Sequence, residues 1–265
     1  MRLRNPRSSR LPEPETEIAV QAALAETDNE LRMGFFEHLN ELRQRLFKSF
    51  LALVLGTGVG MAVAFDVLRF LVQPYAERLR VLGPTGAVVA YFRVALLVGA
   101  ILAIPLITYQ VLMFVVPGLT RRERRFIFMS LPAITVLFLV GVAFAWYVLI
   151  PPAISFLASI EPTLFEAEWT ADNYLSFVTS LLFWMGVAFQ TPLVFFILSL
   201  LGFVGPRGLI RNWRIAIVGS AIGAALITPT VDPINMGLVM GPLLTLYILS
   251  IILVTFGRRF SGINR

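Results

Sequence analysis

Long apolar runs, separated by short charged or proline-containing segments, are the feature that most constrains the fold of this chain. A helix that crosses a bilayer needs ~20 consecutive apolar residues, because all of its backbone groups must bond within the segment. Only 14% of the residues are charged and 57% are hydrophobic, which leaves too little polar surface for a water-soluble globule. The apolar runs lie at about 46–65, 93–116, 127–149, 174–201, 213–227 and 235–256. We therefore predict an all-α membrane protein with six transmembrane helices.

The chain ends differ from the membrane domain in composition. Residues 1–32 are rich in Arg, Pro, Glu and Ser and hold no apolar run that would serve as a signal-peptide core, which predicts a disordered cytoplasmic tail. In 33–48, apolar residues recur at helical spacing with charged residues between them. This pattern predicts an amphipathic helix at the membrane surface that leads into the first span. The membrane domain then covers 33–256, and 257–265 forms a basic cytoplasmic tail.

The distribution of Lys and Arg predicts the orientation. With both termini in the cytoplasm, 18 of the 22 basic residues lie inside: eight in the N-terminal region, four at 121–125, three at 207–214 and three in the C-terminal tail. The 151–173 loop on the opposite side is purely acidic. Short cytoplasmic loops carry an excess of basic residues, so this distribution favours both termini in the cytoplasm.

The run 213–227 is shorter than the other five. Its 15 residues rise only ~22 Å against a hydrocarbon core of ~30 Å, so lipid must thin there or neighbouring helices must cover its ends. The alternative is a misplaced boundary, because Trp213 and Arg214 can extend their polar ends to the interface.

Prolines fall inside several predicted spans, at Pro105, Pro132, Pro192 and Pro242. Each removes a backbone hydrogen bond and favours a kink, and bent helices can enclose a concave face. The alternative is that each proline is merely tolerated, since proline is common in membrane helices.

Several chemistries are excluded by composition and motifs. The chain has no cysteine for a disulfide, and His38 is its single histidine, which disfavours a metal site. It has no phosphate-binding glycine loop and no nucleophile constellation. Its basic residues lie at the ends of apolar runs and form no compact patch for nucleic acid. We predict that the chain is not an enzyme, holds no cofactor and binds no nucleic acid.

A set of local motifs resembles the TatC family. The motifs are the segments 36–46, 105–119, 123–125, 174–177 and 186–189, together with Thr228-Pro229 and Asp232. The resemblance covers about 33–260 in order. It implies a six-span, cup-shaped protein of the cytoplasmic membrane that recognises twin-arginine signal peptides and helps move folded proteins with the proton-motive force. It also implies single-span partner subunits of the TatA and TatB type, and self-association.

Glu41 and Glu123 are the candidate ligands for an arginine pair. A carboxylate pairs bidentately with a guanidinium group, which cannot lose its charge, and the resemblance implies a signal-peptide contact at both positions. Glu37 lies one helical turn before Glu41 and extends the acidic face. Alternatively, Glu37 and Glu41 balance Arg45 on a solvated helix, and Glu123 relieves repulsion among four arginines.

The remaining candidates lie mostly in or beside the spans. Arg43 and Phe114 complete the predicted signal-peptide site, although a phenylalanine in a membrane helix commonly serves packing. Tyr109, Gln110 and Gln190 are polar groups within spans that need partners. Gln190 stands where the family often has a glutamate. It bonds either a signal peptide or partner helix, or a neighbouring helix of the same chain.

Two residues on the predicted outer face have a structural as well as a functional interpretation. Asp232 is either a functional acid or part of an Asx turn before Pro233, and the turn is favoured. Pro74 is expected to fix a bend in the first outer loop. Two rival functions remain open, a secondary transporter of small solutes and an assembly scaffold that works only through partner helices.

Overall fold

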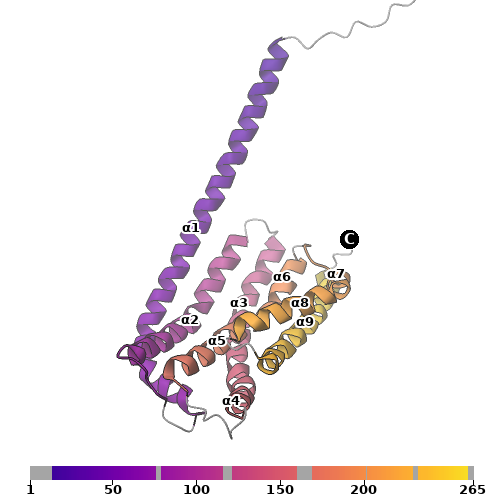
Figure 1. Cartoon of the computed structure of the whole chain (residues 1–265). Helices are drawn as coiled ribbons and strands as arrows, with labels where there is room; N and C mark the ends of the chain where they lie inside the picture. The colour runs from indigo at the N-terminus through magenta and orange to yellow at the C-terminus, as the bar shows by residue number, and fades with distance from the viewer. Residues whose placement is uncertain are drawn as a thin grey trace, which may run out of the picture. The chain divides into compact units, whose positions relative to one another are not determined.

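The computed structural model describes residues 14–75, 79–115, 121–159, 169–200, 202–228 and 232–261, with side chains for 36–75, 79–114, 131–159, 169–199, 202–228 and 232–256. The described residues are helical almost throughout (Figure 1). They form parts of two compact units, Met1–Phe47 and Lys48–Arg265.

Five described helical segments are long and apolar enough to cross a membrane. They are Phe36–Val72, Gly86–Phe114, Leu131–Ala158, Ala171–Ser199 and Pro233–Phe256. A shorter apolar helix, Trp213–Ile227, has the bounds of the short run predicted from the sequence. The prediction of an all-α chain with several apolar spans is confirmed at this level.

Helix α1 (Pro14–Val72) is longer than the sequence pattern predicted. It includes 14–32, which we expected to lack regular structure, whereas residues 1–13 lie outside the described part. The difference has a local cause, because proline suits the first position of a helix and residues 15–31 are rich in Ala, Glu and Leu, which are strong helix formers. The predicted amphipathic segment and the first span belong to this one helix.

Glycines allow α1 to contact α2 (Gly86–Val115) through its backbone. A Cβ atom added to Gly60 would lie 2.3 Å from the carbonyl oxygen of Ala95, and one added to Gly56 would lie 2.6 Å from that of Gly99. Small residues with this spacing are typical of closely packed membrane helices. The crossing leaves no space for a side chain at these positions.

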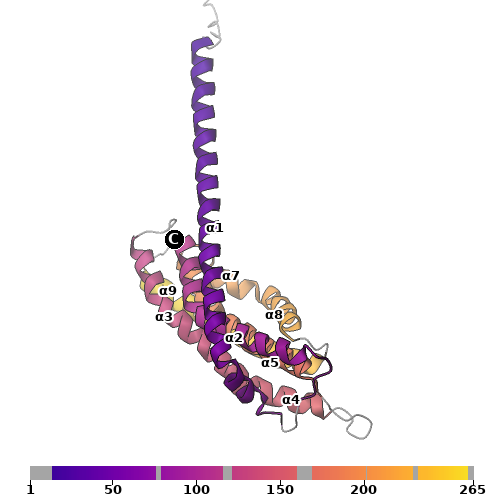
Figure 2. The ribbon, with the colours of Figure 1, turned by 90° about the vertical axis from the view of Figure 1, so that its left-hand side faces the viewer.

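Helix α5 (Ala171–Phe189) packs against both α2 and α3 (Arg121–Phe144). Figure 2 shows α2 and α5 running side by side. The contact with α3 is also made by glycines, since a Cβ added to Gly141 would lie 2.9 Å from the Cα atom of Gly186.

The third span was predicted to end at about residue 149, but the helical segment continues through Pro151-Pro152 to Ala158. Helix α3 continues into a π-helical turn, η2 (Ala145–Leu149), and then into α4 (Ile150–Ala158). Both prolines lie in the first turn of α4, where a helix does not need their missing N–H groups. The prediction was wrong because the π-helical turn resets the hydrogen-bond pattern just before the prolines.

The predicted span 174–201 is interrupted at Gln190. Helix α5 ends there, and α6 (Thr191–Leu200) begins at the next residue. The N–H groups of Leu193 and Val194 both donate to the Gln190 carbonyl oxygen, at 3.0 Å each. Pro192 has no N–H to donate to the carbonyl oxygen four residues before it, and its ring crowds that carbonyl, so one helix ends and a new one starts near this point. Pro192 therefore lies in the first turn of α6 and not in the middle of a continuous helix.

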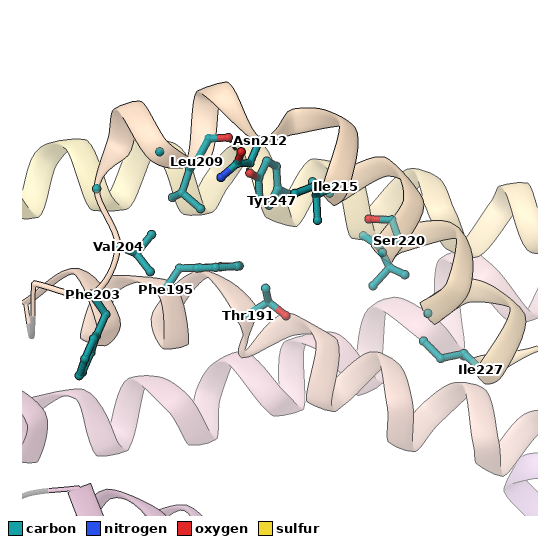
Figure 3. A pocket seen from close by; sticks show the side chains of 16 residues that line it. Thr191, Phe195, Phe203, Val204, Leu209, Asn212, Ile215, Ser220, Ile227 and Tyr247 are labelled. Carbon is teal, nitrogen blue, oxygen red and sulfur yellow. Dashed lines mark hydrogen bonds between the residues drawn. The ribbon is translucent and has the colours of Figure 1, made fainter.

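The last four helices form a group around α9 (Pro233–Ser261). Both α6 and α8 (Trp213–Ile227) pack on α9, and the short helix α7 (Pro206–Arg211) occupies part of the predicted 207–214 loop. A groove of about 590 Å³ lies between these four helices (Figure 3).

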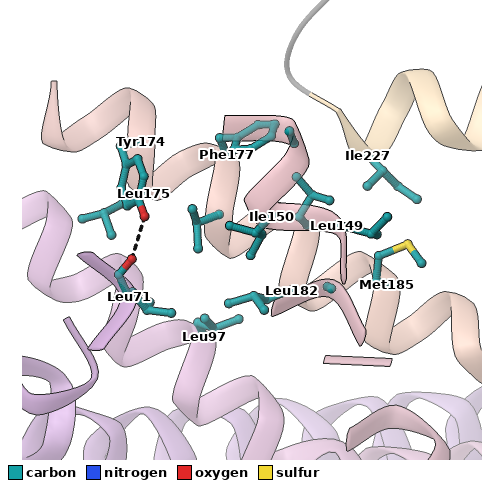
Figure 4. Packing of buried hydrophobic residues seen from close by; sticks show 14 of the residues in the cluster. Leu71, Leu97, Leu149, Ile150, Tyr174, Leu175, Phe177, Leu182, Met185 and Ile227 are labelled. Carbon is teal, nitrogen blue, oxygen red and sulfur yellow. Dashed lines mark hydrogen bonds between the residues drawn. The ribbon is translucent and has the colours of Figure 1, made fainter. Parts of the chain in front are cut away.

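Buried side chains from several helices form the main apolar core (Figure 4). The Tyr174 side chain is 1% exposed, and its hydroxyl donates to the carbonyl oxygen of Leu71 at 2.7 Å. Leu71 lies in the last turn of α1, where carbonyl groups lack helical partners. Tyr174 therefore links α5 to the end of α1.

Replacing Tyr174 with phenylalanine is expected to lower the free energy of unfolding by about 1–2 kcal/mol, because the Leu71 carbonyl loses its donor in a buried setting. Thermal unfolding in detergent measures the change. Tyr147→Phe is the matched control, because Tyr147 is 72% exposed. Equal melting temperatures for the two variants would contradict the assigned role of the hydroxyl.

Candidate functional site

Glu41 lies on α1 in the unit Met1–Phe47 and is bonded to its helical neighbours. Its Oε1 accepts a hydrogen bond from Arg45 Nε at 3.0 Å and a second, shorter one from the same guanidinium group. Its Oε2 lies 3.6 Å from His38 Nδ1. Residues three and four apart share a helix face, so these contacts follow from the sequence spacing. The contact of Glu41 with Arg45 agrees with the alternative in which Glu41 balances Arg45 on the same helix.

The surroundings of Glu41 combine charge with apolar surface. Glu37 and Arg43 are exposed on the same helix. Leu39, Leu42 and Leu46 are also exposed, as expected for the apolar stripe of an amphipathic helix that contacts lipid. The helix therefore presents carboxylates next to an apolar stripe.

Glu123 is the third residue of α3. A glutamate in the first turn of a helix is favoured by the helix dipole, whereas the arginines beside it are not. The Glu123 side chain and those of its arginine neighbours lie outside the described residues. Its contacts therefore stay a prediction.

Tyr109, Gln110 and Phe114 lie in the last two turns of α2 and are half-buried. Residues 109 and 110 are adjacent, whereas 110 and 114 share a face one turn apart. These positions combine an aromatic ring, an amide and a phenol close to the end of one span.

Gln190 occupies the break between α5 and α6. Its residue is half-buried, and the side-chain Nε2 atom is buried without a hydrogen-bond partner among the described residues. The interhelical bond considered for it is thus not formed within the described part of the chain. A buried amide donor without a partner costs about 1–3 kcal/mol, which makes Gln190 a position where an external acceptor would be stabilising.

Asp232 and Pro74 have clear local roles. Asp232 precedes Pro233 at the start of α9, and its Oδ1 and Oδ2 accept hydrogen bonds from the backbone N–H and side-chain amide of Asn235 at 2.7 and 3.0 Å. This arrangement is a helix N-cap with proline at the first position. Pro74 follows the end of α1 at Val72 within a hydrogen-bonded turn.

The sequence reasoning missed an ion pair between α2 and α5. Arg93 donates to the Asp172 carboxylate at 2.9 Å and to the Asp172 backbone oxygen at 2.7 Å. Arg93 also lines a pocket of about 340 Å³ with Ser176, Thr179 and Ser180. The sequence did hold a sign of this pair. Arg93 and Asp172 lie at the ends of separate predicted spans and were predicted on the same side of the membrane, where opposite charges can meet.

A family model decides the relationship of this chain to known proteins. The model described as Sec-independent protein translocase protein (TatC) matches residues 37–242. The chain belongs to the TatC family. Most of the matched range lies in the helices described above.

Individual TatC proteins agree with this assignment. The Synechocystis TatC is 36% identical over 225 residues, which cover 84% of this chain and 89% of that protein. The chloroplastic TATC of Oryza sativa is 36% identical over 219 residues, covering 82% of this chain, although this chain spans only 61% of the rice protein. A crystal structure described as the twin arginine translocase receptor TatC has a TM-score of 0.75 and 33% identity, covering 83% of this chain and 99% of that one.

Membership of the TatC family fixes the broad function. The chain is a membrane component of a protein translocase, and its role is transport rather than enzymatic catalysis. The translocase assignment also implies partner subunits. The prediction from local motifs that the chain is a TatC protein is therefore confirmed.

Proposed function

We propose that this chain binds the twin-arginine signal peptides of folded precursor proteins and supports their transport across the cytoplasmic membrane. TatA-type and TatB-type single-span subunits act with it, and the proton-motive force drives transport. The observation that carries the proposal is the likeness to a structure described as a twin arginine translocase receptor, which extends over 83% of this chain.

Carboxylates supply the recognition chemistry in this proposal. The contact between Glu41 and Arg45 is an example within the chain of a carboxylate holding a guanidinium group through two nitrogens. A carboxylate offers about four acceptor sites, so Glu41 has capacity for a ligand arginine beside Arg45. Glu123 binds the second arginine of the pair. Lysine would be weaker at both positions, because an ammonium group lacks the planar fork.

The other candidate residues extend this site. Glu37 widens the acidic rim, and Arg43 contacts the polar backbone of the signal peptide. Phe114, with Tyr109 and Gln110 beside it, receives the apolar part of the peptide at the end of α2. These roles are consistent with the half-buried state of the three α2 residues.

Gln190 provides a hydrogen bond within the membrane. Its partnerless Nε2 atom supports donation to a carbonyl group of a signal peptide or to a polar group of a partner helix. Glutamine carries no charge, so this position does not relay protons in the proposal.

The proposed topology has six spans with both termini in the cytoplasm. The short helix α8 also crosses the membrane, before α9 in the chain, and brings the five longer segments to a total of six crossings. An even number of crossings places both ends on one side, in agreement with the basic N-terminal region and C-terminal tail. The spans form a cup with its concave face toward the ligand, and copies of the chain self-associate.

Photo-cross-linking tests the proposal against the transporter and scaffold alternatives. Membranes that contain the full chain are incubated with a twin-arginine precursor that carries a photoreactive residue beside the arginine pair. We expect labelled peptides that include Glu41 or Glu123, and loss of labelling when the precursor pair is changed to Lys-Lys.

The controls separate binding from general proximity. Glu41→Gln is compared with Asp66→Asn, because Asp66 is an exposed acid at the other end of the α1 span. We expect reduced labelling only for Glu41→Gln. A precursor that is exported without labelling the chain would refute direct recognition and favour one of the two rival functions.

A further inference from the structure

The groove between α6, α7, α8 and α9 is hollow because glycines line it. Gly205, Gly208, Gly219 and Gly223 all contribute to its wall. A Cβ added to Gly208 or Gly219 would have no atom within 4 Å, and one added to Gly223 would meet only a Leu243 methyl group at 3.5 Å. The space is therefore not needed for close packing of these helices.

Most of the remaining groove wall is apolar. Figure 3 shows Phe195, Ile215 and Ile227 among the side chains around it. At the α7 end lie Asn212 and the Tyr247 hydroxyl, which donates to the Leu209 carbonyl oxygen at 2.7 Å. Thr191 and Ser220 add single hydroxyl groups farther along the wall, so the groove is mostly apolar with its amide and phenol at one end.

Three exposed arginines are next in the chain to groove residues at this end. Arg207 and Arg211 are exposed on α7, and Arg214 is exposed at the start of α8, with its guanidinium group 5.6 Å from the centre of the Trp213 ring. The sequence contains no Asp or Glu between residues 173 and 231. Three arginines at this end thus have no carboxylate in the same stretch of chain.

We propose that the groove binds an anionic phospholipid, with an acyl chain along its apolar length and the phosphate near the arginines. Basic pockets between membrane helices recognise anionic headgroups. Arg214 lies at the start of the short helix α8, and a long arginine side chain there can extend to the headgroup level. This lipid site is independent of signal-peptide recognition.

The charge at one end of the groove favours a lipid over a membrane helix. An anionic headgroup can pair with exposed arginines while its acyl chain lies against the mostly apolar wall.

Photoreactive lipids test this site in the full chain. The protein is reconstituted in phosphatidylcholine nanodiscs with a trace of phosphatidylglycerol that carries a diazirine on one acyl chain, and labelled peptides are identified by mass spectrometry. We expect labels on 215–227, with weaker labelling by a phosphatidylcholine probe of the same acyl structure.

Two variants separate the acyl and headgroup contacts. Gly219→Leu fills the groove and is expected to remove the label from 215–227. Gly237→Leu is its matched control, because that α9 glycine also has open space around its Cβ position and does not line the groove. Changing Arg207, Arg211 and Arg214 to Gln is expected to abolish the preference for phosphatidylglycerol, at about fivefold per charge near the membrane surface.

Three outcomes would overturn the proposal. The first is equal labelling of the wild type and Gly219→Leu, and the second is equal labelling by the two headgroup probes in the wild type. The third is a single-span partner helix that cross-links to 215–223 and is displaced by Gly219→Leu while lipid labelling is unchanged. That result would identify the groove as a helix-binding site.

Discussion

Replacing Glu123 with arginine is expected to reduce the affinity for a twin-arginine precursor about a hundredfold, equivalent to roughly 2.7 kcal/mol. The substitution removes a charge-assisted bidentate contact and adds repulsion between guanidinium groups. Glu123→Ala removes only the attraction and should have a smaller effect, as should Glu41→Ala. The affinity is measured by binding of a fluorescent precursor to purified chain in nanodiscs.

The control for this experiment carries the same change in charge at a distant position. Asp66→Arg is suitable because the Asp66 side chain is 78% exposed and its ion pair with Arg69 is also exposed. We expect this variant to bind like the wild type. Wild-type affinity in the Glu41→Ala, Glu123→Ala double variant would rule out recognition of the arginine pair by these carboxylates.

Replacing Gly60 with leucine is expected to prevent accumulation of folded protein. The new Cβ would lie 2.3 Å from the Ala95 carbonyl oxygen and 3.2 Å from the backbone nitrogen of Gly99. Backbone atoms cannot move aside as a flexible side chain can, so the cost exceeds the ~1–3 kcal/mol typical of an overpacked core. Folded protein is measured by monodisperse elution in mild detergent and by thermal unfolding.

Gly58→Leu provides the control two residues away on the same helix. No atom lies within 4 Å of a Cβ added to Gly58, which is exposed. Leucine is also a better helix former than glycine, so this variant should fold at least as well as the wild type. Similar loss of folded protein in both variants would show that the close contact of α1 with α2 is not the cause.

Apolar length was sufficient to predict an all-α chain with several apolar spans, because the bilayer imposes this constraint directly on sequence. The short run 213–227 became α8 with the same bounds. Local chemistry also indicated that Asp232 belongs to a turn before Pro233, and the structure places it at the N-cap of α9. The recognition of the family depended on short motifs rather than on these physical patterns.

Features that depend on hydrogen-bond register were not predictable in the same way. Pro192 indicates a kink in the apolar run 174–201, but not that one helix stops at Gln190 and another begins at the next residue. The Pro151-Pro152 pair is typical of a helix end unless a π-helical turn precedes it. The pair of Arg93 with Asp172 depends on how two spans pack. The groove likewise results from packing, since glycine positions alone do not show which of them face open space.

The interruption at Gln190 gives one membrane span two separately packed halves. Helix α5 contacts α2 and α3, whereas α6 contacts chiefly α9. A change of backbone angles at Gln190 would reorient the two halves without breaking a hydrogen bond inside either helix. The buried amide of Gln190 lies at this junction, so its unused donor is placed where the two halves of the span meet.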